Sequence, residues 1–258
     1  MSRLRAKCPD CRTYTAVALD SEYECHACGR VYNAGLVRVP QAWGEDGEAM
    51  AEAAWLDLPY PEAGIVEAES LEEQSLALAA DLPDRPLVLG GCCCAHVGAV
   101  EGLAARQGRL SLVWLDAHGD LNTVESSPSG NLWATPLRLL IDSGAVAAGD
   151  VALVGARSLD PAEEDFIRTC GVHSGEDGVQ QALDGTTAAY VAFDLDVLEP
   201  SELSVFMPEP GGLSLDDASR LLAGIRSRTR IVGAGFSGAS FEPSNAEPIA
   251  RLAAALGM

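Results

Sequence analysis

Short apolar runs alternate with helical patterns from about residue 70 to the end of the chain. Apolar runs of five to seven residues predict buried strands at 86–91, 110–116, 151–155, 189–194 and 230–235. Amphipathic stretches between them predict helices at 70–80, 95–106, 132–142, 161–169, 215–226 and 245–256. Ser70 and Glu73 form the pattern of a capping box at the start of the first helix. Alternation of this kind predicts a three-layer α/β fold with a mainly parallel sheet covered on both faces.

The first 38 residues follow a different pattern, in which short strand-like stretches surround two Cys-x2-Cys pairs. Thirteen residues separate the pairs, which consist of Cys8, Cys11, Cys25 and Cys28. Four thiolates at this spacing can close a tetrahedral zinc site, which leaves no open position for a substrate. The alternative is four unrelated buried cysteines. We predict a structural zinc ribbon at 1–38, a Pro/Gly-rich acidic linker at 39–64 and an α/β domain at 65–258.

Composition and charge narrow the possible partners. The net charge of −21 repels phosphate backbones, so nucleic-acid binding is not expected. The first 38 residues have six basic and four acidic side chains, which leaves 11 basic against 34 acidic for the rest. A subunit contact suits the ribbon better than a nucleic acid does. With no apolar run of membrane-spanning length and no apolar core for a secretion signal near the N-terminus, we expect no membrane partner and a cytoplasmic protein.

Polar side chains follow two of the predicted strands at the points where these strands end. Asp116, His118 and Asp120 occupy alternate positions after one strand, and Asp194 and Asp196 follow another. Alternate residues of an extended chain point the same way, so these side chains can converge. Each aspartate alone could be a loop or helix cap. Four carboxylates at one edge would repel one another without bound cations, and a set rich in oxygen ligands suits manganese or a similar divalent ion.

These clusters belong to longer motifs that are similar to a known family. The motifs are Asp116-Ala-His118-Gly-Asp120-Leu-Asn122-Thr, Ser129-Gly-Asn131-Leu, and Phe193-Asp194-Leu-Asp196. In this order they resemble the signatures DAHxDxNT, SGNLHG and SFDxDxxDP of the ureohydrolase family, which contains arginase and agmatinase. Shorter matches at Gly90-Gly91, Gly155 to Pro161 and Gly211 to Leu213 extend the resemblance over roughly residues 60 to 256.

The resemblance implies a site with two manganese ions that share a bridging hydroxide. By position, Asp116 and Asp194 would bridge the ions, and His118 and Asp196 would complete the shell of one. Asp120 would bind the other ion and hold the hydroxide, which makes it a catalytic residue. The implied activity is hydrolysis of a C–N bond in a guanidino, amidino or related compound (a linear amidine) by the metal-bound hydroxide.

The resemblance also implies residues for the substrate and a quaternary structure. Asn122, Ser129 and Asn131 would contact the far end of a small-molecule substrate. Asp160 lies in the segment that matches the family's GxRxxDP motif and is a further substrate-binding candidate. The family forms trimers and hexamers, so a homo-oligomer is expected.

Three departures from the family pattern affect the metals and the substrate. Cys93 replaces a histidine ligand; its softer thiolate would favour zinc or iron over manganese, and the alternative is a buried thiol in a glycine-rich turn. Trp133 replaces the family's proton-shuttling histidine, and an indole has no proton to exchange near neutral pH. Ser240 occupies the position of the glutamate that holds a guanidinium, with Glu242 two residues away as a substitute. His96 is expected to cap or pack and not to act as a ligand.

Two functions from different classes follow. The first is an active metal-dependent hydrolase, for which arginine and agmatine would be poor substrates because Ser240 cannot pair with a guanidinium. The second is a metal-binding homologue that has lost catalysis and acts as a scaffold or sensor. The five acidic and histidine ligands favour the enzyme, whereas Trp133 and Ser240 favour the scaffold.

Overall fold

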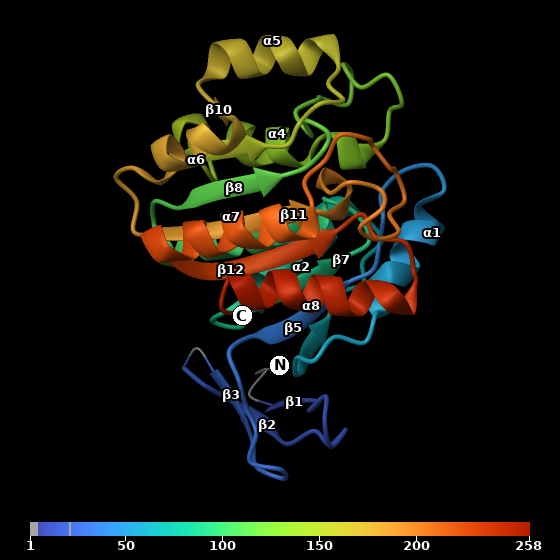
Figure 1. Ribbon diagram of the computed structural model, residues 1–258, viewed down its shortest axis with the longest axis vertical. Helices are drawn as coiled ribbons and strands as arrows, with labels where there is room; N and C mark the ends of the chain where they lie inside the picture. The colour runs from blue at the N-terminus through green and yellow to red at the C-terminus, as the bar shows by residue number, and fades with distance from the viewer. Residues whose placement is uncertain (1–4, 21) are drawn as a thin grey trace.

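The structure, a computed structural model, describes residues 5–20 and 22–258 and contains two sheets (Figure 1). The larger sheet has eight parallel strands in the order β10-β9-β8-β11-β12-β7-β5-β6. In chain order these are β5 (Gly35–Val39), β6 (Glu62–Ile65), β7 (Pro86–Gly90), β8 (Ser111–Leu115), β9 (Val151–Val154), β10 (His173–Ser174), β11 (Ala188–Asp194) and β12 (Arg230–Ser237). The predicted parallel sheet is confirmed, and β5, β6 and β10 add to it.

Helices cover both faces of this sheet. The α-helices are α1 (Gly47–Ala51), α2 (Leu71–Ala80), α3 (Ala95–Gln107), α4 (Pro136–Asp142), α5 (Pro161–Cys170), α6 (Gly175–Leu183), α7 (Leu215–Arg228) and α8 (Ala246–Ala255). Short 3-10 helices are η1 (Glu52–Trp55), η2 (Leu132–Ala134), η3 (Ala148–Asp150), η4 (Leu195–Val197) and η5 (Pro243–Asn245). In Figure 1, α7 and α8 lie in front of the sheet and α2 lies behind it.

The core is divided between the two faces because strand side chains alternate. On β8, Val113 and Leu115 pack in the cluster that contains the buried residues of α6, α7 and α8. Leu112 and Trp114 face the other way, into the cluster that contains the buried residues of α2, α3 and α4. The three-layer α/β fold predicted from the sequence is therefore confirmed.

Local signals in the sequence account for the starts of the helices. The hydroxyl Oγ of Ser70 accepts a hydrogen bond from the backbone N–H of Glu73 (3.2 Å), so α2 begins where expected. The helix expected at 132–142 is divided into η2 and α4. Pro136 explains the break because its ring has no N–H to continue the pattern, and it takes a first-turn position of α4 instead.

The smaller sheet belongs to the N-terminal ribbon, at the bottom of Figure 1. Its antiparallel strands are β1 (Arg5–Ala6), β2 (Ala16–Leu19), β3 (Glu22–Cys25) and β4 (Val31–Tyr32). Backbone hydrogen bonds of 3.1 and 3.0 Å between Lys7 and Glu62 join the ribbon to edge strand β6. A salt bridge of 2.7 Å between Arg12 and Asp57 adds a second contact.

The segment that we assigned to the ribbon's end and the linker contributes to the larger domain. The predicted boundary at residue 38 falls inside β5, and the range 39–64 contains α1, η1 and most of β6. Arg38 interrupts the apolar run of β5, so the sequence does not show the usual pattern of a buried strand. Its side chain is buried because Nε binds Glu62 (2.7 Å) while Nη1 donates to the carbonyls of Ala54 and Leu56. A charged residue thus occupies a position where a buried strand normally has an apolar one.

No helix in the described residues is both long and apolar enough to cross a membrane.

Candidate functional site

The acidic residues of both motifs meet at the carboxyl edge of the sheet. Strands β8 and β11 are parallel neighbours, with Leu115 opposite Phe193. Asp116 therefore follows the end of β8 beside Asp194, the last residue of β11. Asp196 lies on η4, directly after β11. The topology thus places the side chains where ligands bind in parallel α/β sheets.

Two groups of potential metal ligands share one carboxylate. The first group is Cys93, Asp116 and Asp120, and the second is Asp116, His118 and Asp196; within each group the ligand atoms lie within 4.8 Å of one another. His118 Nδ1 lies 2.9 Å from Asp196 Oδ2 and 3.4 Å from Asp116 Oδ1. A shared carboxylate between two ligand groups is suited to a pair of adjacent cations.

Cys93 lies close to two carboxylates of the acid cluster, which consists of Asp116, Asp120, Asp194 and Asp196. Cys93 Sγ lies 3.0 Å from Asp194 Oδ2 and 3.5 Å from Asp116 Oδ2. The thiol is buried, and burial followed by the nearby carboxylates raises the pKa of Cys93 well above its usual value. A thiol in this position would ionise only if a cation bound the sulfur while the proton left to a base or to solvent.

Burial raises the pKa values of Asp194 and Asp196. Burial, followed by the neighbouring carboxylate Asp196, raises the pKa of Asp194 to about 7. Burial, followed by Asp116, raises the pKa of Asp196 to about 6. Burial lowers the pKa of His118, but its hydrogen bonds to Asp116 and Asp196 outweigh this and raise it to about 12. Protons therefore offset the mutual repulsion of these carboxylates, a role that a divalent cation can take over.

Asp120 has both an unusual backbone and an unsatisfied oxygen. Its φ of 53° lies in the left-handed region, which aspartate tolerates better than most residues. The carboxylate is buried, its Oδ2 has no hydrogen-bond partner among the described residues, and burial raises its pKa well above the usual value. A buried carboxylate oxygen without a partner is costly unless a cation or ordered water binds there, and the neighbouring thiol and carboxylate fit a cation.

Hydrogen bonds from the surrounding structure fix the carboxylates. Trp114 Nε1 donates to Asp116 Oδ2 (3.2 Å), and the backbone N–H of Ala117 donates to Asp196 Oδ1 (3.0 Å). Ser237 Oγ donates to Asp194 Oδ2 (3.1 Å). Backbone N–H groups of His118 and Asp196 donate to the other oxygens, Asp116 Oδ1 (2.7 Å) and Asp194 Oδ1 (3.0 Å). A surrounding layer of donors orients metal ligands in the same way.

His96 packs behind the cluster, as the sequence predicted. Its imidazole is fully buried, with Nδ1 3.0 Å from the hydroxyl of Tyr190 and Nε2 3.2 Å from that of Ser237. Burial lowers the pKa of His96 to about 3, so the ring is neutral. Its contacts with Ser237 support Asp194 indirectly.

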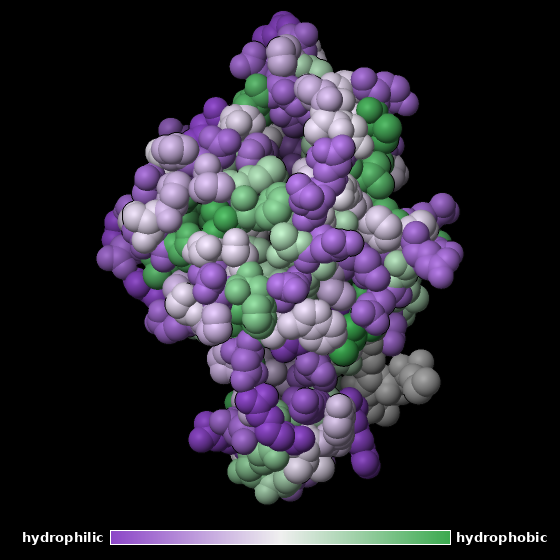
Figure 2. Space-filling model, turned by 90° about the vertical axis from the view of Figure 1, so that its right-hand side faces the viewer, coloured by the Kyte–Doolittle hydropathy of each residue, from purple (hydrophilic) through white to green (hydrophobic). Residues whose placement is uncertain are grey.

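The acid cluster forms one wall of a small cavity of about 20 Å³, which is room for roughly one water molecule. Apolar side chains form the opposite wall: Met50, Trp133, Phe206 and Met207. Trp133 and Phe206 contact edge to face, with ring centroids 6.2 Å apart. Figure 2 looks onto this side of the molecule and shows pale and green residues in the middle of the face, with purple ones around them.

The predicted substrate residues divide into those near the cavity and those away from it. Trp133 lines the cavity. Asn122 donates to Asp160 (2.9 Å), so these two residues bind each other. Asn131 accepts a hydrogen bond from the backbone of Glu45 (2.9 Å), and Ser129 is exposed.

Neither Ser240 nor Glu242 lines the cavity, and Glu242 is exposed at the start of η5. Gly238 is the residue of this segment that lines it, at a φ of 77°. The turn at Gly238 directs the chain away, and a backbone hydrogen bond from Ser240 to Ser204 (3.1 Å) holds it there. Ser240, which matches the position of the family's guanidinium-binding glutamate, thus lies outside the cavity.

Sequence reasoning also missed Glu209 and the apolar wall. Glu209 Oε1 lies 3.8 Å from His118 Nε2, the ring nitrogen that faces away from the acids. Its position two residues before the Gly211-Gly212 match was the available signal. Met50 gave no such signal because it lies in a segment interpreted as a linker.

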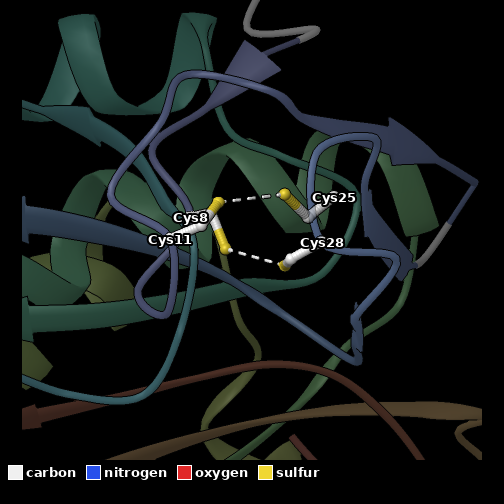
Figure 3. Close-up of side chains that lie close together, drawn as sticks. All are labelled: Cys8, Cys11, Cys25 and Cys28. Carbon is white, nitrogen blue, oxygen red and sulfur yellow. Dashed lines mark hydrogen bonds between the residues drawn. The ribbon is translucent and has the colours of Figure 1, made fainter.

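The four ribbon cysteines converge as predicted (Figure 3). Cys8 and Cys28 have sulfurs 3.8 Å apart, and those of Cys11 and Cys25 are 3.5 Å apart. Ligands about 2.3 Å from a tetrahedral zinc would be separated by about 3.8 Å, so the spacing fits. A hydrogen bond with Thr15 lowers the pKa of Cys25 to about 5, which favours the thiolate that zinc requires.

Fold and site together define an α/β protein with a candidate metal centre at the carboxyl ends of its parallel strands. A sequence model of the arginase family matches residues 30–257. The chain therefore belongs to the arginase family.

Known arginases share part of this sequence. The arginase of Bacillus caldovelox is 35% identical over 156 residues, which cover 50% of this chain and 52% of that protein. The arginase of Bacillus subtilis (strain 168) is 34% identical over 155 residues, with the same coverage of both proteins. The chain thus spans about half the length of the curated relatives it matches.

Solved structures extend the likeness of fold over most of the chain. The Bacillus caldovelox arginase superposes with a TM-score of 0.75 at 24% identity, covering 86% of this chain and 97% of that one. A proclavaminate amidino hydrolase from Streptomyces clavuligerus gives a TM-score of 0.71 at 21% identity, covering 87% of this chain and 90% of that one. Both proteins share the fold described above.

Proposed function

We propose that this protein is a metal-dependent hydrolase that cleaves a C–N bond in a small amidino, guanidino or related amide compound. One observation carries the proposal: two ligand groups, Cys93/Asp116/Asp120 and Asp116/His118/Asp196, share Asp116 at the wall of a cavity. Membership of the arginase family supports it, because the matched relatives are named as arginases.

The proposed centre holds two divalent ions. Asp116 and Asp194 would lie between them, His118 and Asp196 would bind one, and Asp120 and Cys93 would bind the other. When bound, such ions lower the pKa of coordinated water and polarise the group to be cleaved. The mixture of oxygen, nitrogen and one sulfur donor is compatible with manganese, zinc or iron, and Cys93 shifts preference toward the softer ions.

The chain's own groups have distinct tasks in this proposal. Asp120, with its unpartnered oxygen near Cys93 and Asp116, can accept a proton at the proposed centre. Glu209 stands beside the outer nitrogen of His118 and positions the ring, as carboxylates do behind histidine ligands. Trp133 closes the cavity to water and transfers no proton, so proton exchange depends on the carboxylates.

The apolar wall favours an uncharged or weakly charged substrate. Met50, Trp133, Phe206 and Met207 offer no carboxylate to a guanidinium, and Glu242 does not reach the cavity. A buried cation without a partner loses a charge-assisted hydrogen bond worth about 1.5 to 3 kcal/mol. Arginine and agmatine are therefore expected to be poor substrates. The small cavity also implies that the wall must move to admit anything much larger than water.

A non-catalytic role is the competing proposal, supported by Trp133 at the position of a proton-shuttling histidine and by the small size of the cavity. The two proposals share the metal centre and differ in turnover.

Metal analysis followed by a substrate screen tests both. The purified protein would be loaded with manganese, zinc or iron, and release of urea, ammonia or amine would be measured over guanidino, amidino and amide compounds. Turnover that disappears in Asp116→Asn and persists in the exposed control Asp142→Asn supports the hydrolase. Metal binding without turnover of any compound supports the scaffold, and no metal binding beyond the ribbon refutes both.

A further inference from the structure

Three arginines gather around a second cavity at the opposite edge of the sheet from the acid cluster. The cavity, of about 380 Å³, is lined by Asp84, Arg85, Arg226, Thr229, Arg230, Ile231, Val232 and Leu256. Arg85 directly precedes β7, and Arg230 begins β12, its neighbour in the sheet. Arg226 is in the last turn of α7. In Figure 1, β12 points away from the end of α8 where the C-terminus is marked.

These arginines differ from most others in the chain because they have no carboxylate partner. Among the residues that the structure describes, eight arginines form a salt bridge with an aspartate or glutamate within 4.0 Å: Arg12, Arg30, Arg38, Arg109, Arg138, Arg168, Arg220 and Arg251. Within the described part of the chain, Arg85, Arg226 and Arg230 have none. In a protein with 38 acidic and only 17 basic residues, pairing would be easy to achieve, so three unpaired guanidinium groups at one cavity require an explanation.

The polar contacts of the three arginines leave most of their donors free. Within residues 5–20 and 22–258, Arg85 donates to the carbonyls of Asn33 (3.3 Å) and Leu256 (3.5 Å), and Arg230 donates to the amide oxygen of Gln107 (2.7 Å). Arg226 lies over Gly257, where a Cβ would come within 2.6 Å of its Cζ. A guanidinium has five N–H donors, so each has several left for a ligand.

Charge repulsion and an unpartnered hydroxyl both point to a bound anion. Burial and then the nearby Arg226 lower the pKa of Arg85, so the two cations repel each other. Thr229 Oγ1 is buried and has no hydrogen-bond partner among the described residues. Arg226 alone could be explained by the negative end of the α7 dipole, but that account does not extend to Arg85 or Arg230, which belong to other elements.

We propose that this arginine pocket, lined by Arg85, Arg226 and Arg230, binds a small oxyanion with two or more negative charges. Phosphate esters and dicarboxylates share this chemistry, and both are recognised by guanidinium forks. Three cations outnumber the acids Asp84, in the lining, and Glu22, which acts on Arg85, so the pocket favours an anion. The volume accommodates a ligand of several non-hydrogen atoms, and Ile231, Val232 and Leu256 provide an apolar surface for its carbon skeleton. The pocket is separate from the proposed metal centre, since the length of β12 lies between them.

Isothermal titration with inorganic phosphate and with succinate tests the proposal on the full chain and distinguishes the two sources of anion. The test variant is Arg226→Gln/Arg230→Gln, and the matched control is Arg168→Gln/Arg220→Gln, which removes two exposed positive charges outside the pocket lining. We expect one of the anions to bind the wild type, the test variant to bind at least about tenfold more weakly, and the control to stay within about twofold. Absence of binding by the wild type, or an equal loss in both double variants, overturns the proposal.

Chemical protection of the wild type provides a second readout that does not depend on variants. Phenylglyoxal modifies accessible arginines, and peptide mapping identifies which are modified. The bound anion should protect Arg85, Arg226 and Arg230 while leaving Arg168 and Arg220 reactive. Protection that falls on other arginines, or on none, overturns the assignment of the site. Because this readout reports location, anion binding at the metal centre cannot imitate it.

Discussion

Asp194→Asn should stabilise the protein at high pH when its metal centre is empty, although it removes a proposed metal ligand. The pKa of Asp194 is about 7 in the folded protein against 3.8 for an unperturbed aspartate, mainly because the side chain is buried. Since the folded-state pKa is raised, the favourable contribution of the proton is complete below about pH 3.8 and is lost as the pH rises through 7. The shift of about three units corresponds to roughly 4 kcal/mol of lost stability by pH 8.

The amide cannot ionise and avoids this loss. Its oxygen can still accept the hydrogen bond that Asp194 Oδ1 receives from the backbone N–H of Asp196, and its NH2 can donate to Ser237. Between pH 5 and pH 8, the free energy of unfolding of the variant should therefore rise relative to the wild type by about 2 to 3 kcal/mol.

Urea unfolding at pH 5 and pH 8 measures this difference. Both proteins must retain the ribbon zinc and lack other metals, as checked by elemental analysis. Asp142→Asn, an exposed aspartate on α4, is the matched control and should change stability by less than about 0.5 kcal/mol at either pH. Adding manganese or zinc should stabilise the wild type more than the variant. An Asp194→Asn protein that is less stable by the same amount at both pH values would refute the reasoning.

Four further outcomes are expected. Cys25→Ser should remove one zinc per chain and leave the other metals, as elemental analysis would show; this is a cleaner test than deleting residues 1–38, which removes most of β5. Arg38→Met should lower the free energy of unfolding by about 3 to 5 kcal/mol in urea, because it leaves the Glu62 carboxylate without its buried partner. Trp133→Ala should destabilise by a similar amount and enlarge the cavity, so KM should fall more for bulky than for small substrates. Cys93→His should shift metal preference toward manganese in competition with zinc; an unchanged preference would show that Cys93 is not a ligand.

The sequence predicted the parts of the fold whose signals are local. Periodicity located the buried strands, and Ser70 marked the start of α2. The acid cluster was predictable because Asp116 and Asp194 each follow a strand, and the carboxyl ends of parallel strands share an edge. The convergence of the four ribbon cysteines was also predictable, because the spacing of two Cys-x2-Cys pairs is typical of a zinc site.

The parts that were missed depend on contacts between distant residues. Strand β5 contains Arg38, whose burial is possible only because Glu62 and two carbonyls lie around it, and no local pattern reveals this. Ungapped matching to the family pattern placed Ser240 at the position of the guanidinium-binding glutamate, whereas the left-handed turn at Gly238 sends the following residues toward Ser204. The apolar wall combines residues far apart in sequence, such as Met50 and Phe206, so its composition could only be seen in the folded chain.

Gly238 limits the paths by which this protein could evolve. A Cβ at this position would lie 2.1 Å from Oδ1 of Asp194, and the backbone φ of 77° already disfavours other residues. Any mutation there would displace a carboxylate of the proposed centre before it could offer a new group to a substrate. A change of specificity by single substitutions is therefore expected to begin on the opposite wall, which Met50, Trp133, Phe206 and Met207 form. The apolar wall is therefore the part of this cavity in which substitutions can accumulate without displacing a carboxylate of the proposed centre.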